Sequence, residues 1–91
     1  MNYRQRILEA AIGLPFNHIT RDLVADRASV AAGMVNKCFG TVQELRRAVV
    51  AEAVRTENLL IVAQGLAGGY EEARQASESL KTRALAYLGA L

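Results

Sequence analysis

Apolar residues recur along the first forty positions with the three- and four-residue spacing of amphipathic helices. Pro15 is expected to end a first helix at about residue 14, because its ring is not tolerated inside a helix. Thr20 is a good N-cap for a second helix, and Gly40 is expected to stop a third, short helix. The residues of these helices expected to face the core are Ile7, Ala11, Leu14, Val24, Ala28, Val35 and Phe39.

Residues 41–91 predict two further helices. Thr41 and Glu44 have the spacing of a capping box, and the helix that they open is expected to continue to about Gln64. The glycines of "GLAGGY" at 65–70 predict a turn before a last helix. No segment alternates as a strand. The pattern therefore predicts an all-α, five-helix protein of one domain, residues 1–91, with a three-helix unit at 1–40 and a two-helix region at 41–91.

Positive charge is concentrated in the first half of the chain. The whole sequence has a net charge of +2. Residues 1–40 contain five basic and three acidic side chains, whereas residues 41–91 contain six of each. The excess positive charge therefore lies where a polyanion would meet the three-helix unit, although a solvated face explains the same distribution equally well.

Several classes of protein are disfavoured. Cys38 is the only cysteine, so an intrachain disulfide is impossible, and burial as a small apolar residue is favoured for it over a redox role. The longest apolar run, "LLIVA" at 59–63, has five residues, whereas a membrane span needs about 20. We expect a cytoplasmic protein without a signal peptide. His18 is expected in a loop or cap. An enzyme needs a nucleophile, a base and an orienting group together, and the single histidine and lack of a paired-acid motif disfavour one. We also expect no cofactor and no metal site.

The residues around Ser29 have the spacing of a helix-turn-helix. This motif needs a small residue where its helices cross, a residue that tolerates an unusual backbone angle in the turn, and a branched apolar anchor in the second helix. Ala25, Ser29 and Val35 stand at these positions. Glycine is commonest at the turn, and the Cβ of serine is strained at positive φ.

A family resemblance extends this pattern. Residues 20–45, "TRDLVADRASVAAGMVNKCFGTVQEL", resemble without gaps the DNA-binding region of the tetracycline-repressor (TetR) family. "RILEAAIGL" at 6–14 is similar to the first helix of that family, so the resemblance covers about residues 4–55. The residues that match outright are Thr20, Ala25, Arg27, Ala28, Val30, Gly33, Phe39, Gly40, Glu44 and Leu45.

The resemblance implies that residues 30–39 form a recognition helix in the major groove of double-stranded DNA. Gly33 would let the backbone approach the duplex, Lys37 would contact a phosphate, and Asn36 would read a base edge, because its amide both donates and accepts hydrogen bonds. Thr20 and Thr41 would cap helices whose N-termini meet phosphates. The implied DNA-binding residues are Thr20, Ala31, Ala32, Gly33, Met34, Asn36, Lys37 and Thr41.

The sequence also departs from the family. Ser29 replaces the usual turn glycine, Ala32 a usual basic residue, Asn36 a usual tyrosine and Cys38 a usual histidine. We expect no counterpart of the long C-terminal effector domain of the family, because the residues given after the motif leave no room for a pocket of several hundred cubic ångströms. We therefore expect a regulator without a small-molecule effector.

The apolar second half predicts a homodimer. Residues 59–63 are apolar in succession, and one short partner helix in a 91-residue chain cannot cover a helix that is apolar on every side. Two copies of the last two helices would close a four-helix bundle. The expected dimer residues are Leu59, Ile61, Val62, Leu66, Ala73, Ala76, Leu80, Ala84 and Leu88.

Two functions compete at this point. The first is a sequence-specific transcriptional regulator, most simply a repressor that binds an inverted-repeat operator as a homodimer. The second is a helical protein-interaction module that does not bind DNA, because a surface of glycine and alanine also permits close packing on another helix. Salt-dependent binding to duplex DNA separates them.

Overall fold

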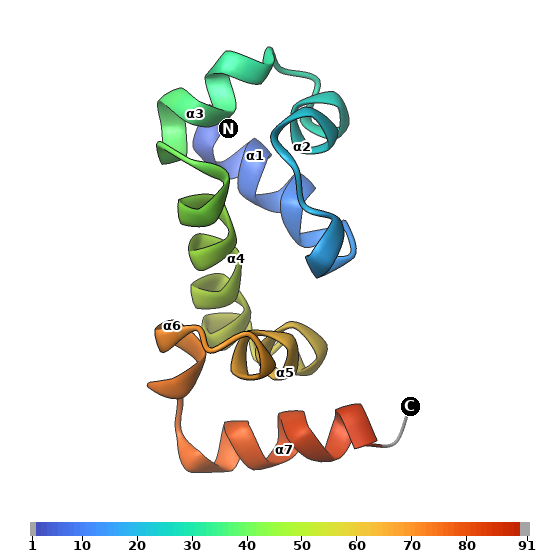
Figure 1. Ribbon diagram of the computed structural model, residues 1–91, viewed down its shortest axis with the longest axis vertical. Coiled ribbons are helices and arrows are strands. Elements are labelled where there is room, and N and C mark those ends of the chain that lie inside the picture. Colours follow the sequence, from blue (N-terminus) through green and yellow to red (C-terminus); the bar gives the residue numbers. More distant parts are fainter. Residues whose placement is uncertain (1, 90–91) are drawn as a thin grey trace. The chain divides into compact units, whose positions relative to one another are not determined.

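The computed structural model describes residues 2–89, which form helices and no strand, as the apolar periodicity predicts (Figure 1). The described residues contain seven α-helices and one 3-10 turn, where the sequence predicts five helices. In chain order they are α1 (Tyr3–Ile12), η1 (Phe16–His18), α2 (Arg21–Ala28), α3 (Ala32–Phe39), α4 (Val42–Thr56), α5 (Leu59–Ala67), α6 (Glu71–Arg74) and α7 (Glu78–Gly89).

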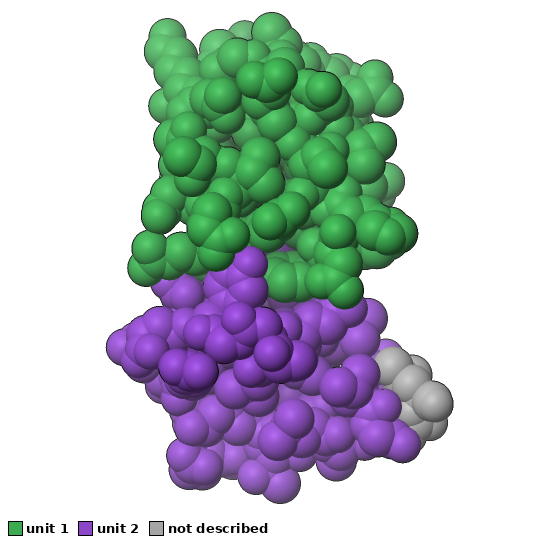
Figure 2. Space-filling view, in the orientation of Figure 1, with its two compact units in different colours: residues 1–48 green, residues 49–91 purple. Residues whose placement is uncertain are grey.

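The chain divides into two compact units, residues 1–48 and 49–91 (Figure 2). The boundary falls inside α4 instead of after residue 40, where the sequence predicts the end of the three-helix unit. The first turns of α4 therefore belong to unit 1, and its last turns belong to unit 2.

In unit 1, helices α1, α2 and α3 contact one another in all three pairs. Asn2 caps α1 by accepting a hydrogen bond from the Gln5 N–H at 2.7 Å, and α1 ends at Ile12, two residues earlier than predicted. Of the expected core residues, Leu14 and Phe39 are only half-buried. The others are buried: Ile7, Ala11, Val24, Ala28 and Val35.

Ser29 ends α2 in the left-handed conformation, with φ 58° and ψ 46°. The Val30 N–H donates to the Ala25 carbonyl at 3.0 Å, the six-residue closure typical of a helix end with a left-handed cap. This geometry confirms the prediction that residue 29 adopts an unusual backbone angle. Three residues, 29–31, then connect α2 to α3.

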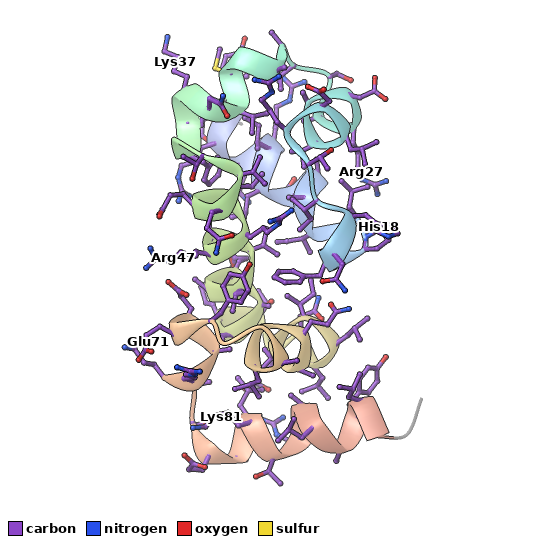
Figure 3. The ribbon with its side chains drawn as sticks, viewed as in Figure 1. His18, Arg27, Lys37, Arg47, Glu71 and Lys81 are labelled. Atoms are coloured by element: carbon purple, nitrogen blue, oxygen red, sulfur yellow. The ribbon has the colours of Figure 1, made fainter. Side chains whose placement is uncertain are left out.

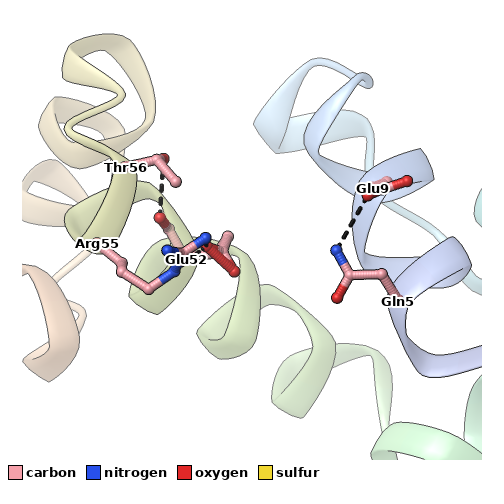
Figure 4. A network of polar contacts seen from close by, with 5 residues as sticks. All are labelled: Gln5, Glu9, Glu52, Arg55 and Thr56. Atoms are coloured by element: carbon pink, nitrogen blue, oxygen red, sulfur yellow. Dashed lines mark hydrogen bonds and ion pairs between the residues drawn. The ribbon is translucent and has the colours of Figure 1, made fainter. Parts of the chain in front are cut away.

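The predicted long helix from residue 42 to Gln64 is wrong, because α4 ends at Thr56. Glu57 takes a left-handed φ of 57°, and Asn58 caps the next helix by accepting the Ile61 N–H at 3.2 Å. The Thr56 hydroxyl donates to the Glu52 carbonyl at 2.9 Å in the last turn of α4 (Figure 4). Asn58 is a favoured N-cap residue and stands three positions before Ile61, so the sequence contains a signal for a helix start here. The apolar periodicity continues past Asn58, and a prediction from periodicity alone therefore misses the break.

The predicted last helix is also divided in two. Helix α6 ends at Arg74, and Ser77 caps α7 by accepting the Leu80 N–H at 3.1 Å. These two breaks raise the number of helices from five to seven. The glycine turn is confirmed at Gly68 and Gly69, which follow the end of α5, and Gly69 has a φ of +77°. The placement of Gly65 in this turn is wrong, because Gly65 lies inside α5 and is buried.

Unit 2 is built around α5, which contacts α6 and α7. Gly65 on α5 lies so close to its neighbours that an added Cβ would be 2.9 Å from Val50 Cγ1 and 3.2 Å from Ala73 Cβ. A side chain at this position would therefore separate α5 from the residues that it contacts. Among residues 2–89, no helix has the length and apolar character needed to cross a membrane.

Candidate nucleic-acid interface

Helix α3 presents one buried and one exposed side. Val35 is fully buried and so fixes the rotation of the helix about its axis. The exposed residues are Gly33, Asn36, Lys37 and Ala31, of which Ala31 stands at the N-cap position just before α3. Figure 3 shows Lys37 extending away from the helix. The remaining two of the expected DNA-facing residues on this helix, Ala32 and Met34, are half-buried.

Gly33 has no role in packing that the described residues reveal. A Cβ built at this position meets nothing within 4 Å, and the φ of Gly33 lies outside the left-handed region. Glycine in a helix costs up to about 1 kcal/mol relative to alanine. Neither the packing of unit 1 nor the backbone conformation requires glycine at residue 33.

Thr20 and Thr41 cap the two helices that flank α3 along the chain. The Thr20 hydroxyl accepts the Leu23 N–H at 3.2 Å, and the Thr41 hydroxyl accepts the Glu44 N–H at 3.1 Å. Both threonines are exposed. The Glu44 carboxylate pairs with Arg47 at 3.1 Å. The predicted capping role of Thr41 is confirmed, while the Glu44 side chain is directed to the next turn of α4.

Two arginines that add to the positive charge bind backbone carbonyls inside unit 1. Arg6 Nη2 on α1 donates to the Ala28 carbonyl at 2.8 Å, and Arg46 Nη2 on α4 donates to the Ile19 carbonyl at 2.8 Å. Both arginines are half-buried. Arg6 is one of the five basic residues counted in residues 1–40, so that count includes one cation that is bound to the backbone of unit 1, whereas Arg46 lies outside the counted range.

Arg4 and Arg27 are more exposed cations of unit 1. The Arg4 guanidinium lies over the Phe39 ring at 4.8 Å from its centroid, which places a positive charge beside the end of α3. The Arg27 guanidinium lies against Gly13 at the end of α1, where a Cβ would be 2.6 Å from Nη2. A cation is favourable at the C-terminus of a helix.

An open hollow of about 280 Å³ lies between α1 and α2 in unit 1. Its volume is below the range of about 300–1,000 Å³ typical of small-molecule sites. Its lining residues are Arg6, Glu9, Ala10, Arg27 and Ala28. Glu9 accepts a hydrogen bond from Gln5 Nε2 at 3.0 Å (Figure 4).

The candidate reactive residues are dispersed. His18 is exposed in η1, in agreement with the predicted loop position. Cys38 is half-buried, so the prediction of a buried cysteine is wrong. Within residues 2–89, no three histidine, cysteine or acidic side chains gather as metal ligands would.

Most of the residues expected at a dimer interface are buried within the single chain. Leu59 and Leu66 are half-buried, and Leu88 is 39% exposed. The apolar surface of α7 includes Leu85 and Tyr87, which are 55% and 42% exposed. The apolar stripe of residues 80, 84 and 88 predicts the interface and leaves out Leu85. The buried residues of the expected set are Ile61, Val62, Ala73, Ala76, Leu80 and Ala84.

The exposed residues of α3 and the arginines of unit 1 thus lie on neighbouring helices. Most of the residues expected at a dimer interface are instead buried in the core of the single chain. Comparisons with protein-family models, curated proteins and solved structures found no match to this chain. A function is therefore inferred from the residues and geometry of unit 1.

Proposed function

We propose that the protein binds double-stranded DNA in a sequence-specific manner, with α2 and α3 acting as a helix-turn-helix and α3 as the recognition helix. The observation that carries the proposal is Gly33, an exposed helical glycine that neither the backbone conformation nor the packing of unit 1 requires. A recognition helix needs small residues where its backbone comes close to the duplex.

The geometry of α2 and α3 supports a helix-turn-helix. Both helices have eight residues, and Ala25 and Val35, the expected crossing and anchor residues, are buried. Ser29 supplies the left-handed residue of the turn. These are the three features that the motif requires.

The side chains on the exposed side of α3 support recognition of both bases and phosphates. Asn36 carries an amide that can donate to and accept from a base edge in the major groove. Lys37 carries a cation suited to a phosphate. The exposed N-termini of α2 and α4, capped by Thr20 and Thr41, are suited to further phosphate contacts.

The simplest regulatory role is repression, in which the bound protein occludes a promoter. We propose a homodimer that binds an inverted repeat, since two-fold symmetry then matches the symmetry of the operator. Its half-sites would lie about 34 Å apart or somewhat more. The interface would use the exposed apolar residues Leu85, Tyr87 and Leu88 of α7, because most of the residues first expected there are in the core. The proposal includes no cofactor and no small-molecule effector.

Selection of duplexes from a random-sequence library by the full chain tests the proposal. We expect enrichment of one motif, and a logarithm of affinity that falls linearly with the logarithm of salt concentration, because phosphate neutralisation releases counterions. A chain that enriches no motif and shows salt-independent binding would leave the second candidate, a helical interaction module. The exposed Ala31 and Gly33 favour that alternative, since small residues also permit close helix packing.

A further inference from the structure

We infer that Arg6 and Arg46 are positioning residues that hold the recognition helix in its binding orientation, and that neither is a phosphate ligand. This inference rests on the proposed function. It opposes the simplest interpretation of the charge distribution, in which every arginine of unit 1 adds to the attraction for DNA.

The two arginines bind carbonyls on either side of α2: that of Ala28, its last residue, and that of Ile19, two residues before the helix begins. Arg46 comes from α4 and donates to the carbonyl of Ile19, the residue just before the Thr20 N-cap. Arg6 comes from α1 and donates to the carbonyl of Ala28, the last residue of the helix. Each contact links residues more than twenty positions apart in the sequence, so each joins α2 to a different helix.

The acceptors explain why arginine is used. The last carbonyls of a helix have no partner within the helix. The carbonyls of Ala25 and Asp26 accept hydrogen bonds from backbone N–H groups of the turn, whereas the Ala28 carbonyl accepts a hydrogen bond from the Arg6 guanidinium. The positive charge of Arg6 is also favourable at the C-terminus of α2. Arg6 is half-buried, and its hydrogen bond to the Ala28 carbonyl directs the guanidinium toward the end of α2.

The orientation of α3 depends on these contacts through the short turn. Only residues 29–31 separate the end of α2 from α3, and Val30 is itself bonded back to Ala25 at 3.0 Å. A rotation of α2 is therefore transmitted to α3. Contacts to base edges require exact placement, whereas attraction to phosphates tolerates displacement. Loss of an arginine contact should thus reduce sequence discrimination more than general DNA affinity.

The test measures binding of the full chain to two labelled duplexes: one selected by the wild type from a random library, and a scrambled duplex of the same length. Arg6→Met and Arg46→Met are each compared with the wild type at low temperature. Circular dichroism first checks that each variant has the helix content of the wild type. We expect affinity for the selected duplex to fall roughly tenfold and affinity for the scrambled duplex to stay within about twofold. The salt dependence should keep the wild-type slope, whereas loss of a phosphate ligand lowers it by about 0.9.

Two further variants serve as controls. Arg55→Met removes the same charge from an exposed residue whose partner, Glu52, lies on the same helix in unit 2 (Figure 4), and it should leave binding unchanged. Arg46→Lys keeps the charge and one hydrogen-bond donor, so it should restore most of the discrimination.

The outcomes separate the inference from the proposed function. A wild type that selects no duplex removes both. If the wild type selects a motif, a slope lowered by about 0.9 in the methionine variants makes the arginines phosphate ligands and overturns the inference alone. Unchanged discrimination in folded variants, or loss of the folded state in both, gives the arginines a role in stability only and also overturns it.

Discussion

Ser29 shows how much a single residue reveals before the structure is known. Its place in the helix-turn-helix spacing predicts a left-handed backbone, and φ is 58°. Glu57 has nearly the same φ, 57°, but no motif surrounds it and its conformation was not predicted. The left-handed conformation is unfavourable for residues other than glycine. The conformational propensity of serine or glutamate therefore does not show where such a residue adopts it. Only the spacing of Ala25 and Val35 identified residue 29.

Replacing Ser29 with glycine should stabilise unit 1. Ser29→Gly removes the Cβ that disfavours a left-handed backbone, and we expect the free energy of unfolding to rise by about 1 kcal/mol. Urea denaturation followed by circular dichroism measures the change. Ser29→Ala keeps the Cβ and should give no such gain. Equal stability of the glycine and serine chains would show that the turn is not strained.

Asn36 and Lys37 are adjacent and exposed, but they should affect DNA binding differently. Asn36→Ala should reduce discrimination at one base position by about 1–3 kcal/mol, because an amide contact to a base edge is lost. Lys37→Ala should weaken binding to all sequences and reduce the salt slope by about one. Binding titrations against single-base variants of the selected duplex distinguish the two effects. Wild-type binding by both variants would exclude this side of α3 as the interface.

At the scale of helices, the structure agrees with the sequence where apolar spacing and a strong cap coincide. Thr20 begins α2 and Thr41 begins α4 as predicted. In unit 2 the apolar residues continue across the breaks at Glu57 and Ser77, so periodicity alone joins helices that are separate. Asn58 and Ser77, the caps of α5 and α7, each stand in a short polar run, at 55–58 and 77–79, but the apolar residues on either side keep helical spacing, so periodicity alone does not show the breaks.

Gly33 provides the test of α3 as a whole element. A Cβ added at residue 33 meets nothing within 4 Å, so we expect Gly33→Leu to fold with equal or greater helix content. It should lose binding to the selected duplex, because the added side chain occupies the space that the duplex needs. Gly89→Leu is the matched control on α7, where an added Cβ also meets nothing within 4 Å, and it should bind as the wild type does. Retained binding by Gly33→Leu would place the duplex elsewhere.

At the scale of the whole molecule, the two units differ in what the sequence predicted. In the segment of the expected helix-turn-helix, Ala25 and Val35 are buried and Gly33, Asn36 and Lys37 are exposed as predicted, whereas Ala32 and Met34, expected to face DNA, are half-buried. The residues predicted for a dimer interface were chosen from apolar content alone, which does not distinguish a core within one chain from an interface between two. Leu80 and Ala84 are buried in the single chain, whereas Leu85 is exposed on the same helix.

Because Leu80 is buried and Leu85 is exposed on the same helix, substitutions at these two positions test folding and association separately. Leu80→Glu introduces a charge at a position that is 4% exposed and should unfold unit 2. Leu85→Glu changes a side chain that is 55% exposed, so the chain should stay folded but become monomeric and bind the selected inverted repeat more weakly. Analytical ultracentrifugation measures the state of association, and Ser79→Glu, an exposed site on the same helix, is the control. A wild type that remains monomeric at tens of micromolar would contradict the dimer.

The contact between Arg46 and Ile19 has a consequence for biosynthesis. A polypeptide leaves the ribosome from its N-terminus, so α2 emerges well before the arginine that binds the Ile19 carbonyl. Until residue 46 has emerged, the Ile19 carbonyl has no arginine donor. The nascent three-helix segment then has the hydrogen bond from Arg6 to Ala28 but lacks the one from Arg46 to Ile19. Completion of unit 1 therefore waits for translation of the first turns of α4, and a gene fragment that stops at codon 40 encodes a unit without this contact.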